Sequence, residues 1–234
     1  MNFKTKLILF CTVIFGLNFF TQNIFAMQRS RGRENKGAGI LPYAVMQDGE
    51  IYFLFNCEVR ADNKLYWGAF VNKFDSRFDI DLKDTAISCF NDNMSSFISE
   101  RLTKDQLDDN KRIRNLLTGY KLYFVKINLA QFTDLYLSNF AQILLKEPNT
   151  NFKGFALISV LDLKMGINST KNRNLVNLDC KMAYFLNPDK SFSFENQIDL
   201  GGYLSTELSH PRNKGKVLEI IQNIIIEERQ LVKR

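Results

Sequence analysis

The sequence predicts an α/β protein in which a mixed β-sheet is sandwiched between helices. Two apolar runs joined by an Asp-Gly turn open the pattern, an amphipathic helical stretch follows them, and strand-like and helical segments then alternate to the C-terminus. The chain has 234 residues, of which 45% are hydrophobic and 24% are charged. A chain of this length and composition can bury one substantial core, so we expect one folded domain.

The first half of this domain is expected to hold three strands and two helices. Residues 37–46 and 50–59 are strands around a Gln47-Asp48-Gly49 turn, and residues 65–74 are a possible third. A helix is expected from Asp81 to about Leu102, because apolar residues recur there at steps of three and four. Asp81 is its N-cap candidate, with Asp84 three residues on. A second, charged helical stretch covers 103–117 and stops at Gly119.

The second half continues the alternation. We expect strands at 120–129 and 155–160, a helix from Thr133 or Asp134 to Lys146 and a hairpin that pairs 182–186 with 192–194. Gly201-Gly202 indicates a turn, and the chain closes with a long helix at 214–232.

The N-terminus has the layout of a signal peptide. Two lysines precede an apolar run at 7–20, and a short polar stretch ends at Ala26. We therefore expect residues 1–26 to be a signal peptide, 27–36 a flexible linker and 37–234 the domain. This predicts an exported protein, periplasmic or secreted, with no stable membrane span after cleavage. A retained anchor is the alternative, because the basic residues just after the apolar run oppose translocation.

Charge and cysteine content exclude some classes of function. The formal net charge is +6, and removal of 1–26 takes away two lysines and no acid. Basic and acidic residues are interleaved beyond residue 37, so no nucleic-acid partner is expected. Cys57, Cys89 and Cys180 are too widely spaced for a metal signature, and we expect buried free thiols.

Three consecutive segments resemble the first part of a Nudix hydrolase domain: GAGILPYAVMQDGEIYFLF, YWGAFVNKFD and DLKDTAISCFNDNMSSF. In that family an AGILPY-type strand and a hairpin precede a W-x-x-F-G-G-K loop. The family box, G-x5-E-x7-R-E-U-x-E-E-x-G-U, then places glutamates on one helix face, where they hold Mg²⁺. The resemblance covers about residues 37–100 by motif and the rest by element order. It implies a Nudix-like α/β/α sandwich and pyrophosphohydrolase-type chemistry.

The chain departs from this pattern where the family holds its metal. Val71 and Asn72 stand in place of the two glycines, while Ser88 and Cys89 replace the R-E pair. The E-E pair becomes Asp92 and Asn93, so that Asp92 is the one surviving box acid. A single carboxylate is not expected to bind Mg²⁺ well, because this cation prefers several charged oxygen ligands. We therefore expect most catalytic acids to be absent and no cofactor to be bound, unless other acids rebuild the site, in which case the cofactor would be Mg²⁺.

These observations leave two main hypotheses about function. The first is a catalytically impaired exported protein that acts as a ligand-binding or interaction module, with a nucleotide-like small molecule or a protein as its partner. The second is an active Mg²⁺-dependent hydrolase of nucleoside diphosphate derivatives, with a site rebuilt from displaced acids: Asp75, Asp79, Asp81 and Asp84. A third possibility is an exported protein that uses the fold only as a scaffold.

Candidate site residues follow from the resemblance. It suggests Trp67, Phe70 and Lys73 for ligand binding and Asp92 for metal binding. Aromatic residues in this part of the chain also fit core packing. The single histidine, His210, precedes a proline and is expected to be a loop residue.

Overall fold

The computed structural model describes residues 36–46, 48–59, 65–94, 101–114, 119–128, 152–170, 175, 177–187 and 191–231. The expected signal peptide, nearly all of the expected linker and the expected helix before Pro148 lie outside these ranges. None of the described helices is long and apolar enough to cross a membrane.

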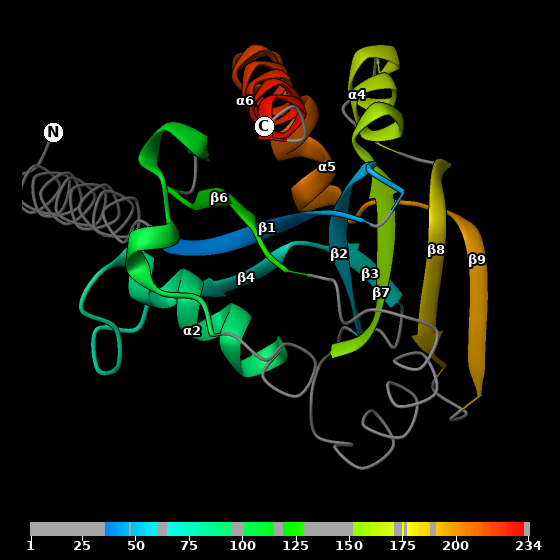
Figure 1. Ribbon diagram of the computed structural model, residues 1–234. Helices are drawn as coiled ribbons and strands as arrows, with labels where there is room; N and C mark the ends of the chain where they lie inside the picture. The colour runs from blue at the N-terminus through cyan, green and yellow to red at the C-terminus, as the bar shows by residue number, and fades with distance from the viewer. Residues whose placement is uncertain are drawn as a thin grey trace, which may run out of the picture.

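A mixed sheet forms the centre of the described part of the protein (Figure 1). Its main order is β5-β6-β1-β2-β7-β8-β9, with β3 paired to β2 and β4 paired to β1. The strands are β1 (Gly37–Val45), β2 (Ile51–Val59), β3 (Leu65–Gly68), β4 (Phe70–Lys73), β5 (Arg112–Arg114), β6 (Lys121–Lys126), β7 (Phe152–Ser159), β8 (Leu178–Leu186) and β9 (Phe192–Ile198). β1 and β6 pair in parallel, and the other paired strands are antiparallel.

The expected hairpin around Asp48 and Gly49 is confirmed. Strands β1 and β2 pair antiparallel with Tyr43 opposite Phe53. Gly49 has φ 77°, which glycine adopts without strain, and the Asp48 carboxylate accepts a hydrogen bond from the Glu50 amide at 3.0 Å. β1 is buried over nearly its whole length because other strands flank it and both of its faces are covered.

Helices cover both faces of the sheet, as the sequence predicted (Figure 1). One face carries α2 (Leu82–Met94), and the opposite face carries α4 (Val160–Ser169), α5 (Gly202–Ser209) and α6 (Pro211–Leu231). The α/β/α layering with a mixed sheet is therefore confirmed.

Two apolar layers result from this arrangement. The layer under α4, α5 and α6 includes Phe53, Trp67 and Phe124, and the layer under α2 includes Phe70 and Phe90. Neighbouring residues of a strand point to opposite faces of the sheet, so each central strand contributes side chains to both layers.

The expected helix over 103–117 is wrong. Two short 3₁₀ turns, Lys104–Gln106 and Asp109–Lys111, lead into β5 instead. The Asp108 carboxylate accepts a hydrogen bond from the Asn110 amide at 2.7 Å, and such local bonds compete with helix formation. Ile113 is buried opposite Leu122, so pairing at the sheet edge holds this segment extended.

Other boundaries also differ from the expectations. Residues 101–103 are not helical, so the first helix does not reach Leu102. The segment after β7 is helix α4, and Gly201-Gly202 is not a simple turn but the start of α5. The last helix begins at Pro211, where the fixed φ of proline suits a first turn.

Candidate functional site

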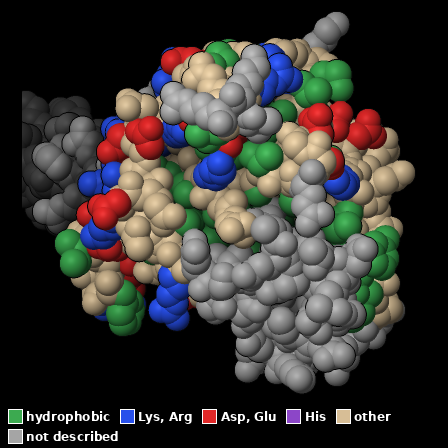
Figure 2. Space-filling view, in the orientation of Figure 1, with side chains coloured by type: hydrophobic (Ala, Val, Ile, Leu, Met, Phe, Trp, Pro, Cys, Tyr) green, Lys and Arg blue, Asp and Glu red, His purple; other side chains and the backbone are tan. Residues whose placement is uncertain are grey.

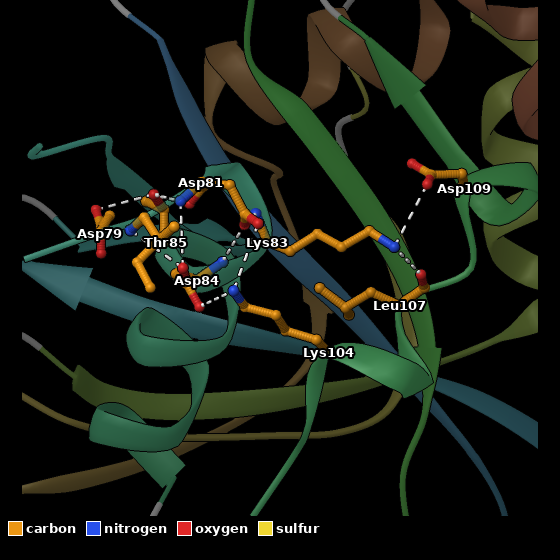
Figure 3. Close-up of polar contacts among 9 residues, drawn as sticks. Asp79, Asp81, Lys83, Asp84, Thr85, Lys104, Leu107 and Asp109 are labelled. Atoms are coloured by element: carbon orange, nitrogen blue, oxygen red, sulfur yellow. Dashed lines mark hydrogen bonds and ion pairs between the residues drawn. The ribbon is translucent and has the colours of Figure 1, made fainter.

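The helix that carries the box motif, α2, begins with a reciprocal pair of caps (Figure 3). The Asp81 carboxylate accepts hydrogen bonds from the amides of Lys83 at 2.7 Å and Asp84 at 3.0 Å. The Asp84 carboxylate in turn accepts from the Asp81 amide at 3.2 Å and pairs with Lys104 at 2.6 Å. The hydrogen bond from the Asp84 amide, followed by that from Lys83, keeps the pKa of Asp81 below its usual range. Both carboxylates thus serve to start the helix.

The remaining displaced acids are engaged in the loop before α2. Asp79 accepts a hydrogen bond from the Thr85 hydroxyl at 2.9 Å (Figure 3). Asp75 forms a two-pronged pair with Arg77, with a shortest distance of 2.6 Å, and this hydrogen bonding lowers the pKa of Asp75 to about 2. These contacts fix the loop geometry, and they occupy the acids that a rebuilt metal site would need.

A lysine of α2 ties the helix to the segment that follows it. Lys83 donates to the Leu107 carbonyl at 2.8 Å and lies 3.4 Å from the Asp109 carboxylate (Figure 3). On the face drawn in Figure 2, basic and acidic side chains of the described residues are interspersed over the surface. The charges around α2 thus compensate one another locally.

Neutral groups fill two box positions on α2. Cys89 is 8% exposed, and burial, with smaller contributions from Glu58 and Asp92, raises the pKa of its thiol to about 12. The Asn93 amide donates to the Cys89 carbonyl at 2.7 Å. At neutral pH neither side chain carries the negative charge that the family places there.

Asp92 is exposed on α2, and no hydrogen bond or ion pair joins it to another described residue. The described residues contain no group of three or more His, Cys, Asp or Glu side chains that could hold a metal ion. Metal binding by Asp92 stays a prediction.

The three residues expected to bind a ligand do not share one site. Trp67 is 6% exposed in the layer under α4 to α6, and its ring lies edge-on to Phe185 at 5.7 Å. Phe70 is fully buried in the other layer, edge-on to Phe90 at 5.0 Å. Lys73 is exposed at the end of β4. The two aromatic rings therefore pack in opposite layers, as core packing requires, and their role in binding stays untested.

A buried amide that the sequence analysis did not single out lies near this region. Asn56 of β2 is 1% exposed and donates to Glu58 at 2.8 Å, while its carbonyl oxygen has no hydrogen-bond partner. Glu58 is among the charges that raise the pKa of Cys89, so the end of β2 approaches α2. In the sequence, the one indication of this buried amide is an Asn that interrupts the apolar residues of the predicted strand.

The structure also places a cavity of about 580 Å³ at the carboxyl ends of the parallel strands β1 and β6. This volume lies within the range of about 300–1,000 Å³ that is typical of small-molecule sites. Its lining combines apolar and polar side chains: Tyr43, Val45, Leu102, Gln106, Asp108, Lys111, Phe124, Val125, Lys126, Ile127 and Asn128. None of the residues expected to bind a ligand is among them.

Two ion pairs connect the wall of this cavity to α6. Lys126 pairs with Glu228 at 2.6 Å, and Lys111 pairs with Glu227. Burial raises the pKa of Tyr43, and Lys111 opposes that rise. The hydroxyl of Tyr43 therefore lies within the field of Lys111, Glu227 and Glu228. The arrangement supplies hydrogen-bond donors and acceptors beside an apolar floor.

His210 lies between α5 and α6, as expected for a loop residue. Its Nδ1 accepts a hydrogen bond from the Arg212 amide at 3.2 Å, at the start of α6. The free thiols of Cys57, Cys89 and Cys180 are buried, which confirms the expectation for these residues.

Comparison with known proteins gives matches among solved structures. No protein-family model matches the sequence, and no curated protein matches it. A binary complex of the Ap4A hydrolase from C. elegans is 15% identical, with a TM-score of 0.33, and the match covers 54% of this chain and 81% of that chain. A second structure of that hydrolase is 20% identical, with a TM-score of 0.28 and coverage of 40% and 67%.

A MutT/nudix family protein from Enterococcus faecalis is 6% identical, with a TM-score of 0.38, and the match covers 86% of this chain and 74% of that protein. The structural neighbours of the chain are thus Nudix hydrolases at low sequence identity, the family that the sequence resembles.

Proposed function

We propose that this is an exported protein with a Nudix-like fold that binds a small molecule or a protein partner without metal-dependent hydrolysis. One observation carries the proposal. Where the family box places two glutamates, α2 has Cys89, a buried thiol with a pKa of about 12, and Asn93, an amide bonded to the Cys89 carbonyl. A thiol in this state is protonated at neutral pH and does not replace a carboxylate as a Mg²⁺ ligand.

The nearby acids support the same conclusion. Asp81 and Asp84 cap α2, Asp79 holds Thr85 and Asp75 holds Arg77. A metal at any of these carboxylates would compete with contacts that already fix the loop and the helix start. The alternative function, an active hydrolase with displaced acids, would therefore have to break these contacts to bring any of the four acids together with Asp92.

We infer that the ligand site is the cavity at the ends of β1 and β6. In open α/β sheets, ligands tend to bind outside the carboxyl ends of parallel strands, and β1 and β6 are the parallel pair. Lys111 and Lys126 offer donors, Tyr43 offers a hydroxyl group, and Leu102 supplies apolar surface. The resemblance to Nudix hydrolases suggests nucleotide-like molecules as the first compounds to test.

The test is calorimetric titration of the purified protein with a panel of nucleosides and nucleoside diphosphate derivatives, in parallel with turnover assays with and without Mg²⁺. Asn128→Trp places an indole at the rim of the cavity, and Asn72→Trp places one on strand β4, next to Lys73. Both positions are exposed, so neither change disturbs the core. We expect Asn128→Trp to abolish binding and Asn72→Trp to preserve it, with no Mg²⁺-dependent turnover.

If Asn72→Trp abolishes binding and Asn128→Trp preserves it, the ligand binds at β4, beside Lys73. Robust Mg²⁺-dependent cleavage that Asp92→Asn abolishes would establish the alternative function and overturn the proposal. If no compound binds, the binding role falls to a protein partner and the cavity assignment is wrong.

A further inference from the structure

The charges around the cavity at the ends of β1 and β6 are paired, and their sum is not positive. Among the described residues that line the cavity, Lys111 and Lys126 are basic and Asp108 is acidic. Lys126 lies 2.6 Å from Glu228 of α6. Lys111 pairs in the same way with Glu227, one residue earlier in the helix. These five groups carry two positive and three negative charges, so their net charge is −1.

The pair between Lys126 and Glu228 is unfavourable for a phosphate to break. The Glu228 side chain is only 7% exposed, whereas that of Lys126 is 46% exposed. A phosphate that drew the lysine away would leave the carboxylate buried without its partner, and loss of one member of a buried pair is strongly unfavourable. The phosphate would also lie close to that carboxylate, and like charges repel. Lys126 is therefore engaged within the protein and is not a free cation for phosphate binding.

The second pair has the same effect at Tyr43. Burial raises the pKa of the Tyr43 hydroxyl, and among the neighbouring charges Lys111 lowers this pKa whereas Glu228 and Glu227 raise it. The hydroxyl thus lies near one cation and two carboxylates. A ligand that contacts the hydroxyl is exposed to the same excess of negative charge, which disfavours an anion at this position.

The rest of the described lining suits an uncharged ligand. Leu102 and Phe124 are buried and supply apolar surface, while Tyr43, Gln106 and Asn128 supply a hydroxyl and two amides. Hydroxyl and amide groups donate and accept hydrogen bonds without carrying charge. Small-molecule sites commonly combine apolar walls with a few such polar groups. The described lining therefore favours recognition through shape and hydrogen bonding over recognition through charge.

We propose that the cavity selects a ring compound that carries no negative charge, such as a nucleoside, and discriminates against the phosphate esters of that compound. This inference rests on the proposed function, because it names the class of small molecule that the same cavity binds. The two lysine–glutamate pairs provide the discrimination, since they neutralise both lysines of the lining and leave one carboxylate in excess.

The experiment is calorimetric titration of the purified protein with the common nucleosides and with the mono- and diphosphate of each. Mg²⁺ is left out, so that the phosphate charge is not neutralised. At low salt we expect a nucleoside to bind and its diphosphate to bind about tenfold more weakly or worse. Salt screens repulsion between charges, so the affinity for the diphosphate should rise as salt is added, while the affinity for the nucleoside should stay constant.

Glu228→Gln changes this charge balance directly. The glutamine oxygen can still accept a hydrogen bond from Lys126, so one negative charge is removed while the contact is kept. Glu219→Gln is the matched control, because it makes the same change on α6 about 2.5 turns away, where Glu219 pairs with Lys216. We expect Glu228→Gln to strengthen binding of the diphosphate several-fold relative to the nucleoside, and Glu219→Gln to change neither affinity.

The possible failures of this inference and of the proposed function are distinguishable. A diphosphate that binds more tightly than its nucleoside and loses affinity as salt is added would overturn the inference and leave the cavity as the ligand site. An equal response of the two glutamine variants would overturn it in the same way. Binding that Asn128→Trp does not weaken, or no binding of any compound, would refute the cavity assignment itself, and the inference would fail with it.

Discussion

Replacement of Asp81 by alanine tests whether the acids near α2 are structural. The change removes the acceptor of the Lys83 and Asp84 amides, and loss of such a cap costs about 0.5–2 kcal/mol. The ion pair with Lys104 at 3.4 Å is exposed, so its loss adds little to this cost. We therefore expect Asp81→Ala to lower the free energy of unfolding by about 1–2 kcal/mol.

Asp92→Asn is the matched variant. Asp92 is exposed and forms no hydrogen bond or ion pair with another described residue, so we expect its free energy of unfolding to change by no more than about 0.5 kcal/mol. Urea denaturation with and without Mg²⁺ measures both effects, and neither protein should respond to the metal. Wild-type stability that rises with Mg²⁺, together with an Asp81→Ala protein that does not respond, would show that these acids bind metal and would refute the structural account.

The difference in the free energy of unfolding between the wild type and Asp81→Ala should also depend on pH, which gives an independent test. Hydrogen bonding lowers the pKa of Asp81 in the folded protein, so its stabilisation is complete above the unfolded pKa of about 3.9. That contribution is lost as the pH falls through the folded value. The difference between the wild type and Asp81→Ala should therefore be full at pH 7 and shrink below about pH 4. A constant difference down to pH 2 would contradict the capping role.

Two further predictions concern the core. The thiols of Cys57 and Cys89, whose pKa values burial raises to about 12, and that of Cys180, raised to about 11, should resist a thiol reagent at pH 8 until the protein unfolds. Rapid labelling of Cys89 in the native protein would mean that α2 is not packed as described. Gly154→Ala should destabilise the protein by several kcal/mol, because a Cβ there would lie 2.3 Å from the Tyr184 carbonyl oxygen. Thermal unfolding measures this loss, and an unchanged melting temperature would contradict the close approach of β7 and β8.

Local patterns predicted the elements whose signals are local. The hairpin at Asp48 and Gly49 and the capped start of α2 at Asp81 follow from turn and capping chemistry within a few residues. The prediction of a helix over 103–117 was wrong because the charged composition of this segment is typical of a helix. The pairing of Ile113 with Leu122, which depends on the whole fold, keeps the segment extended.

The candidate site was predicted less well for a physical reason. Trp67 and Phe70 are three positions apart, and alternation along strands directs such residues to opposite faces of a sheet. They therefore pack in separate layers. The cavity could not be foreseen, because its lining residues come together only when β6 pairs in parallel with β1.

The sequence predicts that most of the box acids are absent, and the structure shows the contacts made by the residues at two of these positions. Cys89 and Asn93 now contribute to the packing and hydrogen bonding of α2, and Phe90 between them is fully buried against Phe70. α2 packs against the sheet through its buried apolar face, and this packing does not depend on carboxylates at the box positions.

The central claim is that α2 has a structural role and does not hold a metal. Calorimetric titration of Mn²⁺ into the purified wild-type protein tests it most directly, with Asp92→Asn as the comparison. The account predicts the same weak, non-saturating heats for both proteins. Saturable, stoichiometric binding by the wild type that Asp92→Asn abolishes would contradict it.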